Sequence, residues 1–264
     1  MFSCNNRIAT MENTTTLNND NLVDKNSVFG IELDVLGNRY VYSDIEITKI
    51  SSVGDTLAKF NTRNTSSISK VSTSNPNKVI VFSKDNQKSW TLDSTLSIIE
   101  DNPLDRVELG EIGMVTRLEG DDILYYSKSN KKFYRTNSNT AKIIESDVQW
   151  DLESEVLDVI ESEDRFIVRT ESNEIYLHDS FGNRVKKIEG PFTDGPIDFQ
   201  HNFIFQINDD ELHYFDINDP TAEFKVYELS GGLKNVTDFK MDRQKIYCIA
   251  NGKLIEKKIM IVNY

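Results

Sequence analysis

The sequence predicts an all-β protein, a six-bladed β-propeller of four-stranded antiparallel blades, and three observations support this prediction. Short apolar runs alternate with turns rich in Asn, Asp, Ser and Gly along the chain. The runs recur with a period of about forty residues, which is typical of one propeller blade. No segment sustains the 3.6-residue period of an amphipathic helix.

The repeat is clearest in the second half of the chain, which holds units four to six. An aspartate stands third in the opening segment of each unit, and Asp158, Asp198 and Asp238 follow one another at intervals of 40 residues. Later apolar runs complete each unit. The strands predicted here are 156–159, 166–168, 174–177, 184–188, 196–199, 203–205, 211–215, 223–227, 236–239, 246–249 and 253–255.

The first half fits the same template more loosely. Glu32, Ser72 and Thr116 stand where the later units have aspartate, so the intervals there are 40, 44 and 42 residues. The strands predicted for units one to three are 28–33, 39–42, 46–50, 56–60, 68–71, 78–82, 89–92, 96–99, 114–118, 123–126, 132–135 and 141–144.

The last unit offers only three runs, so we expect its outer strand to come from residues 19–27 and to tie the two chain ends together. A pair of β-sandwiches would also contain many short strands, but it requires no repeat of fixed length. One propeller uses nearly the whole chain, and we therefore divide the sequence into an N-terminal tether, 1–26, and a propeller, 27–264.

Composition excludes several classes of protein. The chain has 264 residues, 30 Lys and Arg against 43 Asp and Glu, and a net charge of −13. This balance argues against a nucleic-acid surface, which needs clustered basic residues. Aliphatic stretches are about four residues long, far short of the roughly 18 that a membrane helix needs.

The N-terminal segment contains a candidate lipidation site. Residues 1–4 read Met-Phe-Ser-Cys, which is similar to the end of a bacterial lipobox, with Cys4 as the lipidated residue. The charged and apolar parts of a signal peptide are missing from the sequence. Either the sequence begins inside a signal peptide or Met1 is the true start and the similarity is accidental. Residues 5–26 contain seven Asn, which favours a flexible tether.

The second cysteine, Cys248, lies in the apolar run 245–250, where a thiol usually behaves as a small buried hydrophobe. Two cysteines in such different surroundings make neither a disulfide framework nor a cysteine zinc site.

Two resemblances bear on the family. Residues 83–90 are similar to the Asp-box turn of sialidase-like propellers, but Gln87 stands where that pattern has Gly. A broader likeness covers units one and two, in the segments 34–40 (DVLGNRY), 47–50 (ITKI), 74–82 (SNPNKVIVF) and 92–96 (LDSTL). In these segments the chain resembles uncharacterised, envelope-associated six-bladed propeller proteins of Bacteroidota, many of which look like lipoproteins. The resemblance implies a fold and a compartment, but no activity.

Candidate site residues are few. Asp158, Asp198 and Asp238 are candidate cation ligands near one mouth of the central channel. Alternatively, each caps backbone N–H groups or joins adjacent blades, as repeated residues on a symmetric scaffold do. The three histidines, His178, His201 and His213, stand at different points of the repeat and should not converge. We find no pattern typical of a catalytic site.

Charge is unevenly distributed along the chain. Residues 145–174 contain eleven acidic and two basic residues, whereas 123–144 contain five basic residues and no acidic one. Blocks of opposite sign suit electrostatic recognition of a partner, although they also keep a protein soluble. The candidate partner patch consists of Glu153, Glu155, Glu161, Glu163 and Asp164.

The sequence therefore predicts a non-enzymatic protein-interaction scaffold without a cofactor, facing the periplasm or on the outer membrane through Cys4, or else cytoplasmic. One alternative is a ligand-binding or hydrolytic propeller with Ca²⁺ in its channel. Another is a carbohydrate-binding propeller that uses Trp90, Trp150 or exposed tyrosines as stacking platforms.

Overall fold

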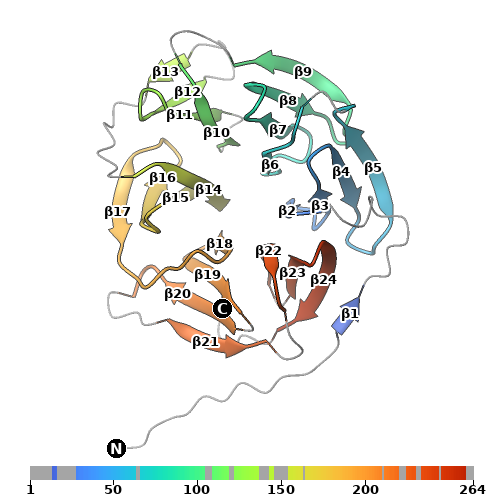
Figure 1. The fold of residues 1–264 in the computed structure, drawn as a ribbon, viewed down its shortest axis with the longest axis vertical. Coiled ribbons are helices and arrows are strands. Elements are labelled where there is room, and N and C mark those ends of the chain that lie inside the picture. Colours follow the sequence, from blue (N-terminus) through green and yellow to red (C-terminus); the bar gives the residue numbers. More distant parts are fainter. Residues whose placement is uncertain are drawn as a thin grey trace, which may run out of the picture.

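Six antiparallel sheets stand in a ring around a common centre in the computed structural model (Figure 1). The structure describes 28–63, 66–104, 109–118, 122–136, 154–162, 164–209, 211–219, 224–229, 233–243 and 245–259, and the backbone of 14–16 and 143–145. Within these residues 24 strands form six four-stranded sheets, which confirms the predicted six-bladed β-propeller. This part of the chain contains no helix, and hence no helical membrane span.

Blades one to three are built in chain order from the centre outward. Their strands are β2 (Gly30–Leu33), β3 (Arg39–Tyr42), β4 (Glu46–Ile50) and β5 (Thr56–Asn61), then β6 (Lys70–Ser72), β7 (Val79–Ser83), β8 (Lys88–Leu92) and β9 (Ile98–Pro103), then β10 (Ile112–Arg117), β11 (Ile123–Ser127), β12 (Lys132–Thr136) and β13 (Ile143–Glu145).

Blades four to six follow the same plan. Their strands are β14 (Val156–Ser162), β15 (Arg165–Thr170), β16 (Ile175–Asp179) and β17 (Arg184–Ile188), then β18 (Ile197–Gln200), β19 (Phe203–Asn208), β20 (Glu211–Asp216) and β21 (Lys225–Glu228), then β22 (Val236–Asp242), β23 (Lys245–Ala250), β24 (Lys253–Lys258) and β1 (Thr14–Thr16).

The hydrophobic core lies between the blades. Six clusters of buried apolar residues occur in the described residues, one at each contact between neighbouring blades. At the first contact the ring of Trp90 in blade two lies 5.8 Å from that of Phe60 in blade one, centroid to centroid. Because both faces of each sheet are covered, a second strand such as β7 is buried along its whole length, whereas outer strands such as β9 are mostly exposed.

The ring is closed by a strand from the N-terminal segment, but not by the strand that the sequence predicts. β1 pairs antiparallel with β24, with Thr14 opposite Lys257 and Thr16 opposite Ile255. The expectation that residues 19–27 supply this strand is therefore wrong. Three consecutive β-branched threonines suit an extended strand better than the Asn-rich stretch that follows. Residues 14–16 of the predicted tether, 1–26, thus belong to blade six, and the boundary at residue 26 stays a prediction.

Two turn residues in blade two, Leu96 and Gln87, have positive φ values and depart from the sequence expectation. Leu96, expected at the start of the fourth strand of blade two, has a φ of 60° in the preceding turn and is buried, so β9 begins at Ile98. Gln87 has a φ of 45° in the turn that is similar to an Asp box. Its side-chain amide accepts from the N–H of Ile112 at 2.7 Å and donates to the carbonyl of Ile112 at 2.9 Å. Gln87 thereby joins blade two to blade three.

Candidate functional site

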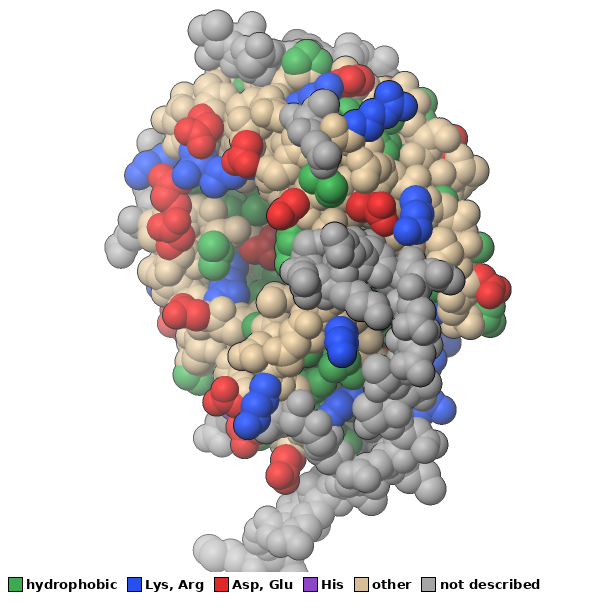
Figure 2. Space-filling view, turned by 45° about the vertical axis from the view of Figure 1, so that its right-hand side comes forward, with side chains coloured by type: hydrophobic (Ala, Val, Ile, Leu, Met, Phe, Trp, Pro, Cys, Tyr) green, Lys and Arg blue, Asp and Glu red, His purple; other side chains and the backbone are tan. Residues whose placement is uncertain are grey.

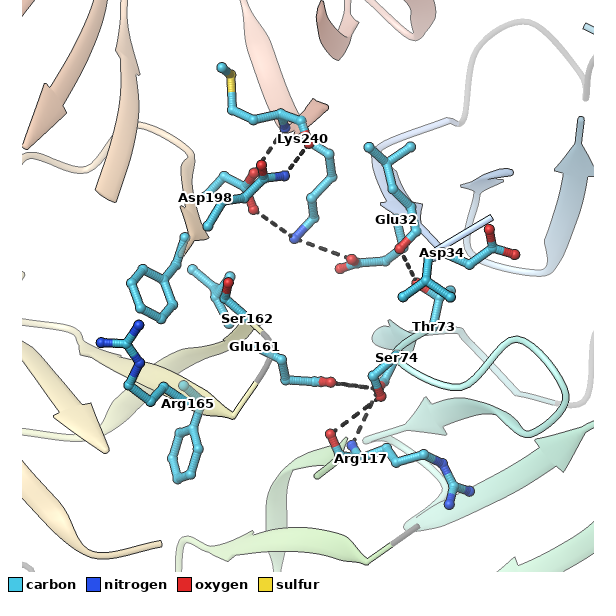
Figure 3. A pocket seen from close by; sticks show the side chains of 18 of the residues that line it. Glu32, Asp34, Thr73, Ser74, Arg117, Glu161, Ser162, Arg165, Asp198 and Lys240 are labelled. Atoms are coloured by element: carbon cyan, nitrogen blue, oxygen red, sulfur yellow. Dashed lines mark hydrogen bonds and ion pairs between the residues drawn. The ribbon is translucent and has the colours of Figure 1, made fainter. Parts of the chain in front are cut away.

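The innermost strands carry charged side chains into the central channel, as Figure 3 shows for four of them. Buried charges are costly unless they are paired, so their partners decide what this channel can do. The charged residues concerned, in chain order, are Glu32, Lys70, Asp158, Glu161, Asp198, Asp238 and Lys240.

Two lysines and three carboxylates form one continuous ion-pair network across the channel. Lys240 Nζ lies 3.2 Å from Glu32 Oε2 and 3.3 Å from Asp198 Oδ1. Lys70 Nζ lies 2.9 Å from Asp158 Oδ1 and 3.8 Å from Glu32 Oε1. Glu32 therefore joins the two lysines, and the network connects five of the six blades.

The pKa values show that pairing outweighs burial at both lysines. Burial alone would lower the pKa of Lys240, but the carboxylates of Glu32, Asp198 and Asp238 raise it well above its usual range. Burial likewise opposes the charge of Lys70, and neighbouring carboxylates raise its pKa. Burial raises the pKa of Glu32 against the pull of both lysines. Both lysines are therefore charged at neutral pH.

The three repeated aspartates, proposed as candidate cation ligands, occupy equivalent places on the innermost strands. Asp198 Oδ2 accepts a hydrogen bond from the Met241 N–H of the next blade at 2.9 Å, and Asp238 Oδ2 accepts from the Ile31 N–H of blade one at 2.8 Å. These two join adjacent blades, as the alternative interpretation expects. Asp158 Oδ1 accepts from the N–H of Val159 at 2.8 Å, and both Asp158 and Asp198 also belong to the ion-pair network.

Histidines do not gather in the channel. His178 is fully buried and stacks on Phe166, with ring centroids 5.0 Å apart, whereas His213 Nε2 lies 3.0 Å from Glu211 Oε2 on the same strand. His201 lies in a turn at the channel mouth. Within the described ranges, no group of three or more His, Cys, Asp or Glu side chains is placed to hold a metal ion.

A cavity of about 1030 Å³ occupies one end of the channel. Its wall consists of the ends of the innermost strands and the turns after them, which include 33–35, 73–76, 164–165 and 241–243. Figure 2 shows acidic and basic side chains interspersed over one face of the ring and a recess left of the centre of that view. A cavity of this size is large enough for a small molecule or for side chains of a partner.

Glu161 enters this cavity from β14 and is held by a serine of blade two, which blade three in turn positions (Figure 3). The Ser72 hydroxyl lies 3.0 Å from Glu161 Oε1 and accepts a hydrogen bond from the Arg117 N–H at 3.2 Å. Since the Ser72 oxygen already accepts, its own proton is directed to the carboxylate. Burial and the charge of Glu32 raise the pKa of Glu161 to about 7, although Lys70 and the Ser72 hydroxyl lower it.

Asp238 should make stability depend on pH in the neutral range. Burial raises its pKa to about 7, from a usual value of 3.8, although Lys240 opposes this. Because the folded-state pKa is raised, its contribution is full below about pH 4 and is lost as the pH rises through 7. We expect the free energy of unfolding to fall by about 1 kcal/mol between pH 6 and 8 through this group. Urea unfolding at both pH values should show this fall in the parent protein and a smaller one in Asp238→Asn.

The matched control is Asp164→Asn, because Asp164 is exposed and paired with Arg165. Its pH profile should match that of the parent protein. An unchanged profile in Asp238→Asn would contradict the assignment.

The candidate partner patch is not brought together as one surface. Glu155 precedes β14 and lies 3.7 Å from Lys128 of blade three, whereas Glu161 lines the cavity and Asp164 lies in the turn after the strand. A strand advances about 3.3 Å per residue, so β14 separates Glu155 from Asp164 by most of the depth of the ring. Glu153 and Glu163 lie outside the described residues.

The proposed carbohydrate platforms are not available where the structure describes them. Trp90 is only 4% exposed and belongs to the core between blades one and two. It cannot stack on a sugar from solution. Trp150, like Cys4, lies outside the described residues.

Sequence reasoning missed both lysines of the network. Lys240 stands two residues after Asp238, and side chains two apart on a strand point to the same side. Lys70 stands two residues before Ser72, and Ser72 is the residue that takes the place of the later aspartates. The sequence signal for both lysines was a charged residue two positions from the aspartate position of an innermost strand. Which charged residues pair across the channel could not be predicted, because it depends on how the ring closes.

Comparison with known proteins shows similarity of fold but no similarity of sequence that would indicate a family. No family model matches it, and no curated protein matches its sequence. A solved Bacteroides thetaiotaomicron protein of unknown function shares 15% identity with a TM-score of 0.66, covering 94% of this chain and 72% of its own. The matches establish a β-propeller. They show no common activity, because identity is this low.

Two further solved structures are similar over most of their length. Virginiamycin B lyase from Staphylococcus aureus has 11% identity and a TM-score of 0.63, covering 94% of this propeller and 99% of its own chain. The Pan2 WD40 domain of Neurospora crassa has 10% identity and a TM-score of 0.62, covering 90% and 91%. An enzyme and a WD40 domain thus resemble this propeller about equally.

Proposed function

We propose that this propeller is a protein-binding scaffold, and that its partner docks over the channel mouth where the cavity opens. One observation carries the proposal: apolar side chains stand exposed at the tips of turns on this face. Val35, Leu36 and Val53 in blade one are 80%, 67% and 83% exposed, and Phe181 in blade four is 69% exposed. Exposed apolar side chains that share one face can serve as separate anchors for a partner.

Two of these tips are built by the same local sequence. Residues 34–39 and 179–184 both read Asp-x-apolar-Gly-Asn-Arg. In each turn the aspartate accepts the N–H of the apolar residue, at 2.9 Å for Leu36 and 3.0 Å for Phe181, and the N–H and side-chain amide of the following asparagine. The glycines have φ values of 77° and 90°, which other residues rarely adopt. The turn backbone that carries Leu36 and Phe181 is therefore fixed by hydrogen bonds.

The position of the tips supports a contact that spans the mouth. Blades one and four lie on opposite sides of the ring (Figure 1). Val35 and Ser180, which precede the two tip residues, both line the cavity. A partner that covers Leu36 and Phe181 together must therefore cross the channel opening. We infer an apolar contact surface on the partner, since exposed apolar side chains gain most from burial against apolar area.

Affinity purification from the source organism tests this proposal. We expect a stoichiometric partner with the parent protein, and at least tenfold less of it with the double variant Leu36→Ser and Phe181→Ser. The control is Leu57→Ser with Val226→Ser, both on outer strands and both 53% exposed. It should recover the partner fully. Equal recovery with both double variants, or no stoichiometric partner at all, would refute the docking face.

We further propose that the scaffold acts at the bacterial cell envelope, anchored by a lipid on Cys4. This proposal rests on the resemblance of residues 1–4 to a lipobox and on the Asn-rich stretch after it. Mass spectrometry of the N-terminus of the native protein should find a lipidated Cys4 as the first residue. An unmodified Met1 would instead favour a cytoplasmic adaptor.

A further inference from the structure

Glu161 differs from the other channel carboxylates in its partners. Glu32, Asp158 and Asp198 each lie within 4 Å of a lysine nitrogen, and Asp238 accepts two backbone N–H groups. Glu161 receives hydroxyl protons but forms no ion pair with any described residue. It also faces the cavity, where a ligand could reach it.

We propose that the channel cavity binds an organic ammonium ion, with Glu161 as the carboxylate that receives the ammonium group. The Ser72 hydroxyl, fixed by the Arg117 N–H, already orients this carboxylate from one side. A carboxylate has about four acceptor sites, so the remaining ones can receive N–H donors from the cavity. Such a charge-assisted pair in a partly buried site is stronger than a neutral hydrogen bond.

The expected charge of the ligand follows from the balance of acidic and basic side chains on the innermost strands. Five carboxyl groups, on Glu32, Asp158, Glu161, Asp198 and Asp238, face two lysines. Both lysines already bind carboxylates, so neither is available to an anion. The Arg117 side chain donates to the Lys78 carbonyl at 3.0 Å. An added cation beside Glu161 would therefore offset the excess of acid on the innermost strands, whereas Arg165 and Arg243 line the cavity in or beside its turns.

An organic cation fits this wall better than a metal ion does. Ca²⁺ takes six to eight oxygen ligands, whereas an ammonium group needs only three acceptors. Here the Glu161 carboxylate stands beside the Ser72 hydroxyl, and the apolar residues Leu33, Leu118 and Phe199 also line the cavity. An alkyl chain next to the ammonium group could contact these side chains.

The same chemistry has two sources, a free amine or a lysine side chain of a docked protein. Isothermal titration of the full chain should use cadaverine for the first and N-acetyl-lysine methylamide for the second, with pentanol and glutarate as neutral and anionic controls. We expect one or both ammonium probes to bind, and neither control to do so. Tighter binding of the lysine amide assigns the site to a partner, and tighter binding of cadaverine to a free amine.

Variants decide whether Glu161 is responsible. Glu161→Gln should weaken binding at least tenfold, because a neutral amide replaces the charge. Glu155→Gln is the matched control, since Glu155 stands at the other end of β14, and it should bind like the parent. Ser72→Ala should weaken binding by removing the orienting hydroxyl, and Ser72→Thr should restore it. Equal melting temperatures establish that each variant is folded.

Proton release on binding provides a second measurement, which would not change if Glu161 had only a structural role. A cation favours the ionised form of Glu161, which faces Glu32 of β2, Lys70 of β6 and the Ser72 hydroxyl. At pH 6 the heat of binding should therefore vary with the ionisation enthalpy of the buffer, and this variation should vanish in Glu161→Gln. Binding of glutarate, binding of Ca²⁺ alone, or full ammonium affinity in Glu161→Gln would overturn the inference. These outcomes are independent of the Leu36 and Phe181 variants.

Discussion

Lys240→Met should destabilise the folded protein by about 3–5 kcal/mol at pH 7, the cost typical of breaking a buried ion pair. The substitution removes the cation that lies 3.2 Å from Glu32 and 3.3 Å from Asp198, and leaves both carboxylates without it in the channel. The buried Met241 N–H would still bind Asp198, so the strand contact itself remains. Urea unfolding followed by fluorescence measures the loss.

The matched control is Lys245→Met, on β23 of the same blade. Lys245 Nζ lies 2.8 Å from Glu256 Oε1, but its side chain is 33% exposed, so water screens the pair and the loss should be much smaller. Lowering the pH should also reduce the cost of Lys240→Met, because the stranded carboxyl groups can then take up protons. Equal losses in the two variants would show that the channel network does not stabilise the ring.

His178 should make the protein sensitive to acid, with a loss of about 2–3 kcal/mol between pH 7 and 4.5. Burial and, to a smaller extent, the charge of Arg184 lower its pKa to about 3, although hydrogen bonding to Gly182 opposes both. The folded state therefore resists protonation that the unfolded chain accepts at its usual pKa near 6.5. Stability is full above that value and falls as the pH drops toward 3.

Comparison with His178→Phe isolates this effect, because phenylalanine keeps a ring against Phe166 and cannot titrate. Urea unfolding at pH 7 and 4.5 should show a fall in stability at least 2 kcal/mol larger in the parent protein than in this variant. His213→Gln is the control, since His213 is partly exposed on β20, and it should behave like the parent. A parent protein as acid-resistant as His178→Phe would contradict burial of a neutral histidine.

The blades could be predicted from the sequence because each is a local structure. Strands such as 166–168 and 246–249 are apolar runs separated by short turns, and pairing with the next run in the chain needs no long-range information. Closure of the ring could not be predicted in the same way. It joins Thr14–Thr16 to a strand at the other end of the chain, and no local pattern favours that pairing over 19–27.

The charges illustrate the same limit at the level of side chains. Residues 145–174 form an acidic block in the sequence, yet Glu155 pairs with Lys128, Asp158 with Lys70 and Glu174 with Lys187. A strand places successive side chains on opposite sides and its ends on opposite faces of the ring. A run of like charges is therefore dispersed when the strand folds, and only the assembled blades show which charges meet.

The pairing of β1 with β24 also sets an order of events during synthesis. Thr16 is synthesised long before its partner Ile255, with five whole blades between them in the chain. The intervening blades can form as they emerge, because their strands pair with immediate neighbours. Blade six must wait for both β1 and β24, and bringing them together carries the largest loop-closure entropy among the strand pairings that the structure describes. Completion of the ring is thus a late step, and a nascent chain that stops before β24 leaves β1 without its partner.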